Sequence, residues 1–460
     1  MKKLSYIFLG LFCGALAFYF SALSLPSTQP VALKQQPPND SMLLLPLDSR
    51  PVCGAMAQKL GQLAAINVIV PPKDLLDNYQ QPADTEKLLS WLEANARAYP
   101  YGVVSADLLL HGGLLQSRRQ FAEPHKQDKL LAALRNLRRQ SPNPLTVFSV
   151  VPRLLVSDEL LPDRWYQYHL MRYSQLLDMT EINGDPYFTQ QLLEYQKQIP
   201  LDVLQKYLAL YEQSQRFNSL LLTDAAAAPP QTPPAVVIGQ DDASPLGLPH
   251  RNALRLEQLA ERRGLQNAAP LTYGADEIAA LLVARRYLQS SGWQPKIYLQ
   301  YAAPSAPFKY MPYMAVSVDA ALRNQLQLLG AQQAADWQNA DIVCYVNCGD
   351  EDALPGTAQV HDLQKLLDSG KPTALIDLGA KFSEAELLLP RLVEENVPLN
   401  RLAACESCAA NAPTNGKSPP FTPPTCASPP NACWRIIFTK SGCTPGCVPI
   451  WKASVSPPRP

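Results

Sequence analysis

Short apolar runs that stop abruptly at polar residues recur along the chain, and this pattern limits the possible folds more than any other feature. Residues 42–47 stop at Asp48, and residues 145–151 stop at Pro152. Runs of this kind are typical of strands that are buried on both faces of a sheet. The same form recurs at 66–70, 103–110, 236–238, 297–299, 342–346 and 374–376.

Segments with apolar residues at a spacing of three to four lie between these runs and predict helices. They are 85–98, 126–139, 252–263, 276–289, 320–330 and 383–395. The alternation predicts an α/β fold with a mainly parallel sheet. Two forms remain open, a doubly wound sheet and a barrel-like (TIM-type) sheet, which the number of strands slightly favours. The stretch 158–217 is rich in Tyr, Gln and Leu, and it predicts a helical insertion that covers the site as a lid.

The N-terminal end of the chain lacks this pattern. Lys2 and Lys3 precede an apolar run over 4–23, which predicts a signal peptide or a signal anchor over 1–25. The protein is therefore predicted to be exported, to the periplasm, to the exterior or to a position anchored to the cytoplasmic membrane by its N-terminus. Residues 26–40 are rich in Pro, Gln and Ser, which predicts a disordered linker.

The C-terminal stretch has a different composition from the rest of the chain. Proline pairs replace the hydrophobic periodicity there, and cysteines crowd together. These cysteines are Cys405, Cys408, Cys426, Cys433, Cys443 and Cys447. We predict one α/β domain over 41–404, with the insertion at 158–217, and an aberrant, disordered tail over 405–460. A small disulfide knot and a zinc module remain as alternatives for the tail.

The charge and the motifs of the chain exclude several classes of function. A formal net charge of +0 and the lack of a basic stripe argue against nucleic acid as a partner. We expect a small-molecule or carbohydrate substrate, and contact with a membrane only through the N-terminal segment. The lack of HExxH, Gly-x-Ser-x-Gly and Walker-type motifs disfavours a zinc hydrolase, a serine nucleophile and nucleotide binding. We predict no cofactor.

Adjacent carboxylates at the end of one predicted strand are the sharpest chemical signal. Asp241 and Asp242 follow the run 236–238, and parallel strands gather such groups at their carboxyl ends. One of two close carboxylates can keep its proton and act as an acid while the other stays charged. Asp276 and Glu277 add two further acids. The predicted catalytic residues are therefore Asp241, Asp242, Asp276 and Glu277.

Structural roles remain open for these acids. Asp242 can cap the turn that follows it, and Asp276 and Glu277 can complement the dipole of the helix that they open. A divalent cation held by Asp241, Asp242 and Asp276 is a further alternative, because magnesium and calcium prefer oxygen ligands.

Polar residues near other strand ends predict contacts to a substrate. Asp48 and Arg50 place an acceptor beside a forked donor, which suits a sugar or a carboxylate, and an internal pair that fixes the loop is the alternative. His111 can relay a proton or have a structural role. Cys344 and Cys348 are predicted to be buried thiols or a disulfide. The predicted substrate-binding residues are Asp48, Arg50, Asp107, His111, Arg118, Arg153, Gln240 and Asn347.

Several of these segments, taken together and in this order, resemble the bacterial family called domain of unknown function 4127. They are Leu44 to Pro51, Val70 to Lys73, Ser105 to Gly113 running on to Ser117-Arg118, Gly239 to Ala243, and Gly274 to Glu277. The resemblance covers 42–404 and implies a common fold but no known reaction. Family members continue into a Tyr-x-Gly-Trp-Asn-Thr segment and further helices, whereas this chain departs at Cys405. If the missing segment contributes to the site, the resemblance implies an inactive copy.

Two hypotheses for the function follow from these residues. The first is an exported, glycoside-hydrolase-like enzyme that acts on a carbohydrate or a cell-wall fragment by paired-carboxylate acid/base chemistry. The second is a non-catalytic envelope protein that binds the same kind of ligand, or a family member inactivated by its C-terminal truncation. Tyr273, Tyr301 and Tyr313 lie near strand ends and would contact a sugar in either case.

Overall fold

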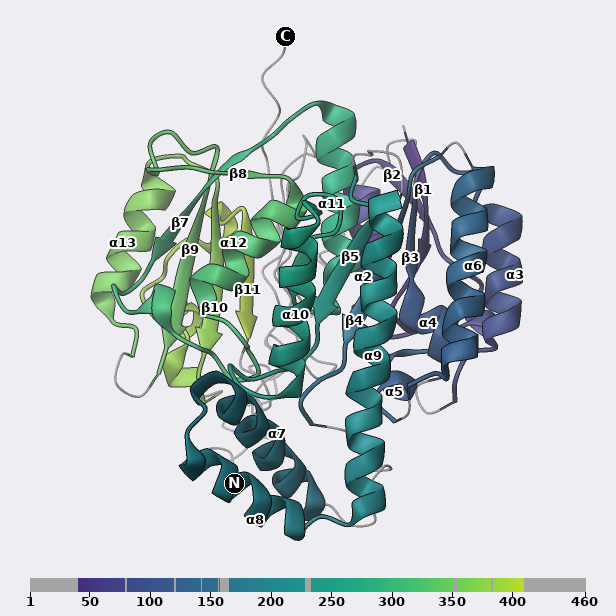
Figure 1. The fold of residues 1–460 in the computed structure, drawn as a ribbon. Helices are drawn as coiled ribbons and strands as arrows, with labels where there is room; N and C mark the ends of the chain where they lie inside the picture. The colour runs from purple at the N-terminus through teal and green to yellow at the C-terminus, as the bar shows by residue number, and fades with distance from the viewer. Residues whose placement is uncertain are drawn as a thin grey trace, which may run out of the picture.

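Two parallel sheets stand next to each other at the centre of the protein (Figure 1). The computed structural model describes residues 40–408 except 79–80, 120, 142, 156, 158–164, 228–232, 351–353 and 382–383. The predicted signal segment, the linker up to residue 39 and the tail after residue 408 lie outside the described residues. Among the described residues, no helix combines the length and hydrophobicity that crossing a membrane requires.

The first sheet contains six strands in the order β2-β1-β3-β4-β5-β6, and all of its ladders are parallel. Its strands are β1 (Asp40–Leu45), β2 (Ile66–Ile69), β3 (Gly102–Ser105), β4 (Leu145–Val151), β5 (Val236–Gln240) and β6 (Leu271–Tyr273). Every residue of β3, β4 and β5 is buried. Helices therefore cover both faces of the sheet, as the continuous apolar runs predict.

The second sheet contains five parallel strands in the order β11-β10-β9-β7-β8. Its strands are β7 (Lys296–Tyr301), β8 (Gln332–Gln333), β9 (Ile342–Gly349), β10 (Thr373–Gly379) and β11 (Ala404–Cys408). The α/β fold is thus confirmed. Neither sheet closes on itself within the described part of the chain, so no closed barrel is observed there.

Helices surround both sheets and fill the space between them (Figure 1). They are α2 (Ala55–Leu63), α3 (Thr85–Asn95), α4 (Ala106–His111), α5 (Leu114–Ser117), α6 (Pro124–Gln140), α10 (Leu248–Arg262), α11 (Ile278–Ser291), α12 (Val318–Leu329), α13 (Thr357–Asp368) and α14 (Leu389–Glu394). One core cluster joins strands of both sheets through α11 and α12, and it includes Met42, Ile278 and Ile376. Two other clusters lie on the outer faces of the first and second sheets.

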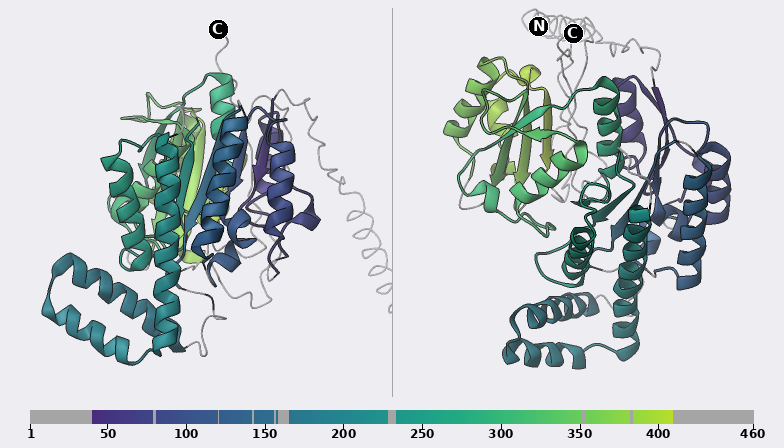
Figure 2. Two further views of the ribbon diagram at one scale, coloured as in Figure 1. Left: turned by 45° about the vertical axis from the view of Figure 1, so that its right-hand side comes forward. Right: turned by 45° about the horizontal axis from the view of Figure 1, so that its top comes forward.

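The predicted helical insertion consists of three helices, two of which project from the body of the protein (Figure 2). They are α7 (Trp165–Asn183), α8 (Pro186–Lys197) and α9 (Leu201–Ala227). The buried carboxylate of Asp178 on α7 accepts hydrogen bonds from the backbone of Gly247 and from His250, each at 2.8 Å. The insertion is thereby fixed to the loop after β5 and to the start of α10. Its role as a lid stays a prediction.

The predicted strand 103–110 is wrong in its second half. β3 ends at Ser105, and residues 106–111 form the short helix α4. The hydroxyl of Ser105 accepts a hydrogen bond from the backbone N–H of Leu108 at 3.2 Å and so caps this helix. Because all of Ala106 to Leu110 is buried, the apolar run has no exposed face from which a helical period could be read.

The sequence did not predict some other elements, and it placed one domain boundary too early. The helices α2 and α13 and the strands β6 and β8 have no predicted counterpart. The predicted boundary at residue 404 falls inside β11, which pairs with β10 from Ala374 to Leu378. Residues 405–408 therefore belong to the second sheet and not to a disordered tail, because the β10 edge provides a backbone partner for them.

Candidate functional site

The end of β1 carries an arginine that links two carboxylates from distant parts of the chain. The Arg50 Nε donates to Asp48 Oδ2 at 2.8 Å, and its two terminal nitrogens donate to Asp276 Oδ2 at 3.0 Å and Oδ1 at 2.6 Å. The Asp276 side chain is nearly inaccessible to solvent, with 3% exposed. A planar guanidinium suits such a fork because it can bind both oxygens of one carboxylate. The predicted Asp48–Arg50 pair is thus present, and it also holds Asp276.

A second arginine neutralises Asp241 in the same way. The Arg118 Nε and one terminal nitrogen donate to Asp241 Oδ2 at 2.8 and 2.5 Å. The other oxygen, Oδ1, accepts from the backbone N–H of Asp242 at 2.9 Å. Since the Asp241 side chain is fully buried and Arg118 is almost so, this ion pair is held in a region with little solvent.

Glu277 is a buried acid that retains unused bonding capacity. Its Oε1 accepts from the Gln325 Nε2 at 3.0 Å, while its Oε2 has no hydrogen-bond partner among the described residues. Burial raises the pKa of Glu277 well above its usual range, and the negative charges of Asp276, Asp242 and Asp241 raise it further. Burial and these charges both favour the protonated form of the Glu277 carboxyl group.

The backbone at Gly274 makes room for this acid. Gly274 has a φ of +135°, and a Cβ built on it would lie 1.7 Å from the Glu277 Oε1. A side chain at this position would displace the carboxyl group. The segment between β6 and α11 thus fixes where Glu277 points.

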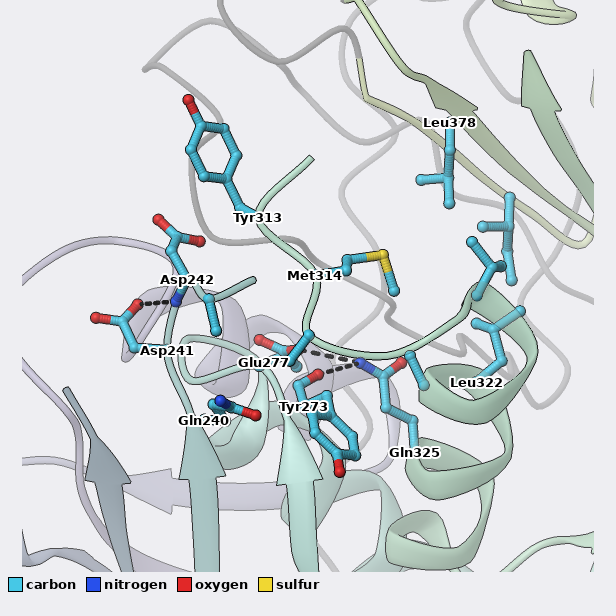
Figure 3. Close-up of a pocket in the computed structure, with 16 residues that line it drawn as sticks. Gln240, Asp241, Asp242, Tyr273, Glu277, Tyr313, Met314, Leu322, Gln325 and Leu378 are labelled. Atoms are coloured by element: carbon cyan, nitrogen blue, oxygen red, sulfur yellow. Dashed lines mark hydrogen bonds between the residues drawn. The ribbon is translucent and has the colours of Figure 1, made fainter. Parts of the chain in front are cut away.

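A pocket of about 690 Å³, including solvent at its mouth, lies where the ends of β5 and β6 face α12 and β10 (Figure 3). Its polar walls are formed by Gln240, Asp241, Asp242, Glu277 and Gln325, and its apolar walls by residues such as Met314, Val318, Leu322, Ile376 and Leu378. Tyr313 stands at the rim with 46% of its surface exposed. A concave site with an apolar lining and few polar groups is typical of small-molecule binding.

Gln240, the last residue of β5, has a carboxamide that this chain leaves unused. Only 4% of the residue is exposed, and neither Nε2 nor Oε1 has a partner in the described part of the protein. Its backbone carbonyl is occupied, since it accepts from the N–H of Gly274 at 2.9 Å. The side chain lines the pocket beside Glu277 (Figure 3).

Asp107 and His111 lie on the helix α4, and not at a strand end as predicted. The Asp107 Oδ2 accepts from the backbone N–H of Val150 at 2.9 Å, and burial raises its pKa to about 7. Burial also lowers the pKa of His111 to about 3, so its imidazole is neutral at neutral pH. Its ring packs edge-on against Phe121, with 4.5 Å between the ring centroids.

Two other predicted substrate contacts are occupied within the protein. The Arg153 Nε donates to the carbonyl of Leu155 at 2.5 Å, and burial lowers the pKa of Arg153, as does the nearby charge of Arg118. Asn347 lies on β9 in the second sheet, where its Nδ2 donates to Asp377 at 2.7 Å and to the carbonyl of Glu386 at 2.9 Å. Asn347 therefore does not join the other predicted residues.

Two of the three tyrosines predicted to contact a sugar use their hydroxyl groups in hydrogen bonds within the protein. The hydroxyl of Tyr273 donates to Glu257 at 2.7 Å, and that of Tyr301 donates to Asp319 at 2.8 Å. Tyr273 and Tyr313 both line the pocket, and Tyr313 is the more exposed of the two.

The sequence reading missed Gln325 and Cys53. Gln325 is a polar residue on the apolar face of α12, between Leu322 and Leu326, and this interruption of the stripe was the available signal. The Cys53 Sγ lies 3.8 Å from Asp276 and 3.7 Å from Arg50, and burial raises the pKa of its thiol well above the usual value. Cys344 and Cys348 are free, buried thiols, so the disulfide alternative is wrong for this pair.

Metal ligands do not come together in the described residues, where no three His, Cys, Asp or Glu side chains are grouped to hold an ion. Arg118 already neutralises Asp241, and Arg50 already neutralises Asp276. A cation would have to compete with both guanidinium groups. The alternative of a divalent cation at Asp241, Asp242 and Asp276 stays an untested prediction.

Comparison with known proteins gives one match, which extends over most of the chain. A family model described as "Protein of unknown function (DUF4127)" matches residues 42–408. No curated protein and no solved structure matches the chain. The matched range includes both sheets and ends with β11.

Proposed function

The chain belongs to the family of proteins of unknown function DUF4127, and from this premise we propose that it is a hydrolase acting on a carbohydrate or a cell-wall fragment. The observation that carries the proposal is Glu277, a buried acid with a raised pKa that lines the pocket with an oxygen unused by the described residues. A carboxylic acid kept neutral by burial is suited to donate a proton to a leaving group.

Asp242 is the proposed charged partner of this acid. It lines the same pocket and is more exposed than the buried Asp241. In the proposed reaction Glu277 donates its proton to the bridging oxygen of a glycosidic bond while that bond breaks. The negative charge of Asp242 stabilises the positive charge that develops on the sugar ring. Water then attacks the ring carbon and adds its hydroxyl group, while its second proton passes to the Glu277 carboxylate.

The two ion pairs change the roles proposed for the remaining acids. Asp241 and Asp276 are each neutralised by an arginine, so they are proposed to position the loops after β5 and β6 and not to transfer protons. Arg50 retains 31% of its side-chain surface and is the more accessible of the two cations. The apolar wall with Tyr313 at its rim suits the flat, apolar face of a sugar ring.

One observation favours the second candidate function, a binding protein without catalysis. Two of the four acids predicted to be catalytic are consumed by internal ion pairs, which leaves the minimum of two for acid/base chemistry. Export to the periplasm, the exterior or the membrane surface is proposed in both cases. That proposal rests on Lys2, Lys3 and the apolar run 4–23.

The proposal is tested by hydrolysis of chromogenic glycosides and cell-wall fragments by the full chain. Glu277→Gln and Asp242→Asn are each expected to lower kcat/KM about 100-fold or more, because each removes one partner of the acid/base pair. Activity is expected to fall on the alkaline side of the pH profile as Glu277 loses its proton, and this limb should vanish in Glu277→Gln.

The matched control is Asp224→Asn, which alters a similarly buried carboxylate on α9 that pairs with Arg135 at 2.7 Å, away from the pocket. It should leave kcat/KM unchanged. Hydrolysis that persists in Glu277→Gln would contradict the acid role. Sugar binding without any hydrolysis would favour the binding protein.

A further inference from the structure

We infer that the pocket recognises the N-acyl group of an amino sugar, such as the acetamido group of N-acetylglucosamine, through the carboxamide of Gln240. This inference rests on the proposed function, because it names the substrate class of the same site. It starts from the two side-chain atoms of Gln240, both buried at the end of β5 and both without a partner in the described chain.

A buried carboxamide without partners is costly to keep, so its place in a ligand pocket calls for a complementary group. A glutamine side chain offers one N–H donor pair and one carbonyl acceptor in a single plane. A secondary amide offers the reverse, a carbonyl acceptor and an N–H donor. Because a secondary amide is trans, its carbonyl and its N–H point in opposite directions, and one glutamine side chain can bond directly to only one of them. The Gln240 Nε2 is placed here to donate to the acetamide carbonyl.

The charges around Gln240 narrow the choice of ligand. Asp242 and Glu277 line the same pocket, and Asp241 stands behind them with its charge balanced by Arg118. A ligand carboxylate would be repelled by Asp242, whereas an amide is neutral. Neutral amides therefore fit the walls better than acidic ligands of the same size.

The apolar side of the pocket suits the methyl group of an acetamide. Leu322 on α12 and Leu378 on β10 face the pocket from the side opposite Asp241 and Asp242 (Figure 3), and Ile376 on β10 also lines it. A methyl group placed against them is removed from water, which favours the N-acetylated sugar over the free amine. The free amine lacks both this methyl group and the carbonyl oxygen to which Gln240 would donate.

Two further polar atoms remain for the hydroxyl groups of the sugar, a carboxyl oxygen and an amide carbonyl oxygen. They are the Glu277 Oε2 and the Gln325 Oε1, each buried and each unpartnered within the residues that the structure describes. Because Gln325 donates to Glu277 through its Nε2, its carbonyl oxygen is held in a fixed direction. The pocket thus combines the Gln240 carboxamide, which can bind an amide, with two fixed polar atoms that can bind hydroxyl groups.

The test measures binding of N-acetylglucosamine, glucosamine and glucose to the full chain by calorimetry. N-acetylglucosamine is expected to bind at least tenfold more tightly than either of the others. Gln240→Leu should lower its affinity about tenfold by removing the hydrogen bond to the acetamide carbonyl, and should leave the affinity for glucose unchanged. Gln240→Glu keeps an acceptor but loses the donor, so it should also weaken the N-acetylated sugar.

The control variant is Gln58→Leu on α2, which removes a carboxamide that donates to the carbonyl of Val68 at 3.2 Å. It should leave all three affinities unchanged. Thermal unfolding of Gln240→Leu checks its fold, and an unchanged or higher Tm is expected because an unpartnered buried polar group is removed.

The outcomes separate this inference from the proposed hydrolysis. A preference for the N-acetylated sugar without turnover leaves the inference standing and removes only the catalytic role. Turnover of glycosides with no preference for N-acetylated ones overturns the inference and leaves hydrolysis intact. Equal binding of the three sugars, or binding of none, overturns the inference as well.

Discussion

The two sheets share one strand order but differ in what lies at their carboxyl ends. Counted from its own first strand, each sheet places the second strand on one side and the later strands in sequence on the other. At the end of the first sheet, Arg50 and Arg118 bind carboxylates 226 and 123 residues away along the chain. At the end of the second, Asp377 accepts from the backbone N–H groups of Leu388 and Leu389.

The difference lies in how completely the buried polar groups are satisfied. The Asp377 Oδ1 also accepts from Asn347, so both of its oxygens are used to fix the segment that leads into α14. In the first sheet, Gln240 and Glu277 keep unused atoms at a pocket. A buried acid at a strand end therefore indicates a ligand site only where bonding capacity is left over and a cavity adjoins it.

The comparison is tested most strongly at Arg118. Arg118→Met would leave Asp241 buried without its cationic partner, and we expect the free energy of unfolding to fall by about 3–5 kcal/mol. Urea denaturation measures this change. The double variant Arg118→Met with Asp241→Leu should recover most of the loss, since it removes the uncompensated charge. A cost below about 1 kcal/mol for Arg118→Met would contradict a buried ion pair in the first sheet.

The second sheet is tested at Asp377. Asp377→Ala would leave the N–H groups of Leu388 and Leu389 without their acceptor, and we expect a loss of about 2–4 kcal/mol in unfolding free energy. Sugar binding, measured by calorimetry at a temperature where the variant is folded, should not change. A loss of binding with unchanged stability would mean that this end of the second sheet is also a ligand site.

A change in the pH dependence of stability is expected at Asp107. Its pKa is raised from 3.8 to about 7, so between these pH values the unfolded chain is ionised while the folded chain keeps its proton. Unfolding then releases a proton, and stability falls as pH rises through this window. Asp107→Asn should remove up to about 1.4 kcal/mol of this loss per pH unit.

Urea titrations of both proteins at several pH values below and above this window measure the difference. Parallel stability curves would show that Asp107 is ionised in the folded protein. They would also remove the contrast with Asp377, whose oxygens are all satisfied by the chain.

The sequence predicted those strands and helices whose hydrophobic pattern is compatible with only one kind of secondary structure. The run 145–151 matches β4 residue for residue, because apolar and β-branched residues buried on both faces specify a strand. The prediction of a strand over 103–110 was wrong in its second half, because a helix buried on all sides has no polar face. The only local sign of this helix is its N-cap residue, Ser105.

The site was predictable to the extent that strand ends mark it. Asp48, Asp241 and Asp242 were found because each follows an apolar run. Arg50, Arg118 and Asp276 were also named, but the long-range pairs that they form were not predicted, because an ion pair across more than 100 residues leaves no local trace in a single sequence. The positive φ of Tyr313, which sets its ring at the pocket rim, likewise follows from tertiary packing and not from its neighbours in the chain.

The core cluster shared by the two sheets has a mechanical consequence for the pocket. Residues of β1, α11 and β10 pack in one cluster, so moving the sheets apart would expose it to water at a large cost in free energy. The wall formed by Ile376 and the wall formed by Glu277 are therefore held at a set spacing by the helices packed between them. The rigid spacing of the two walls therefore limits the size of the ligand, and a ligand wider than the pocket cannot bind whatever its charge.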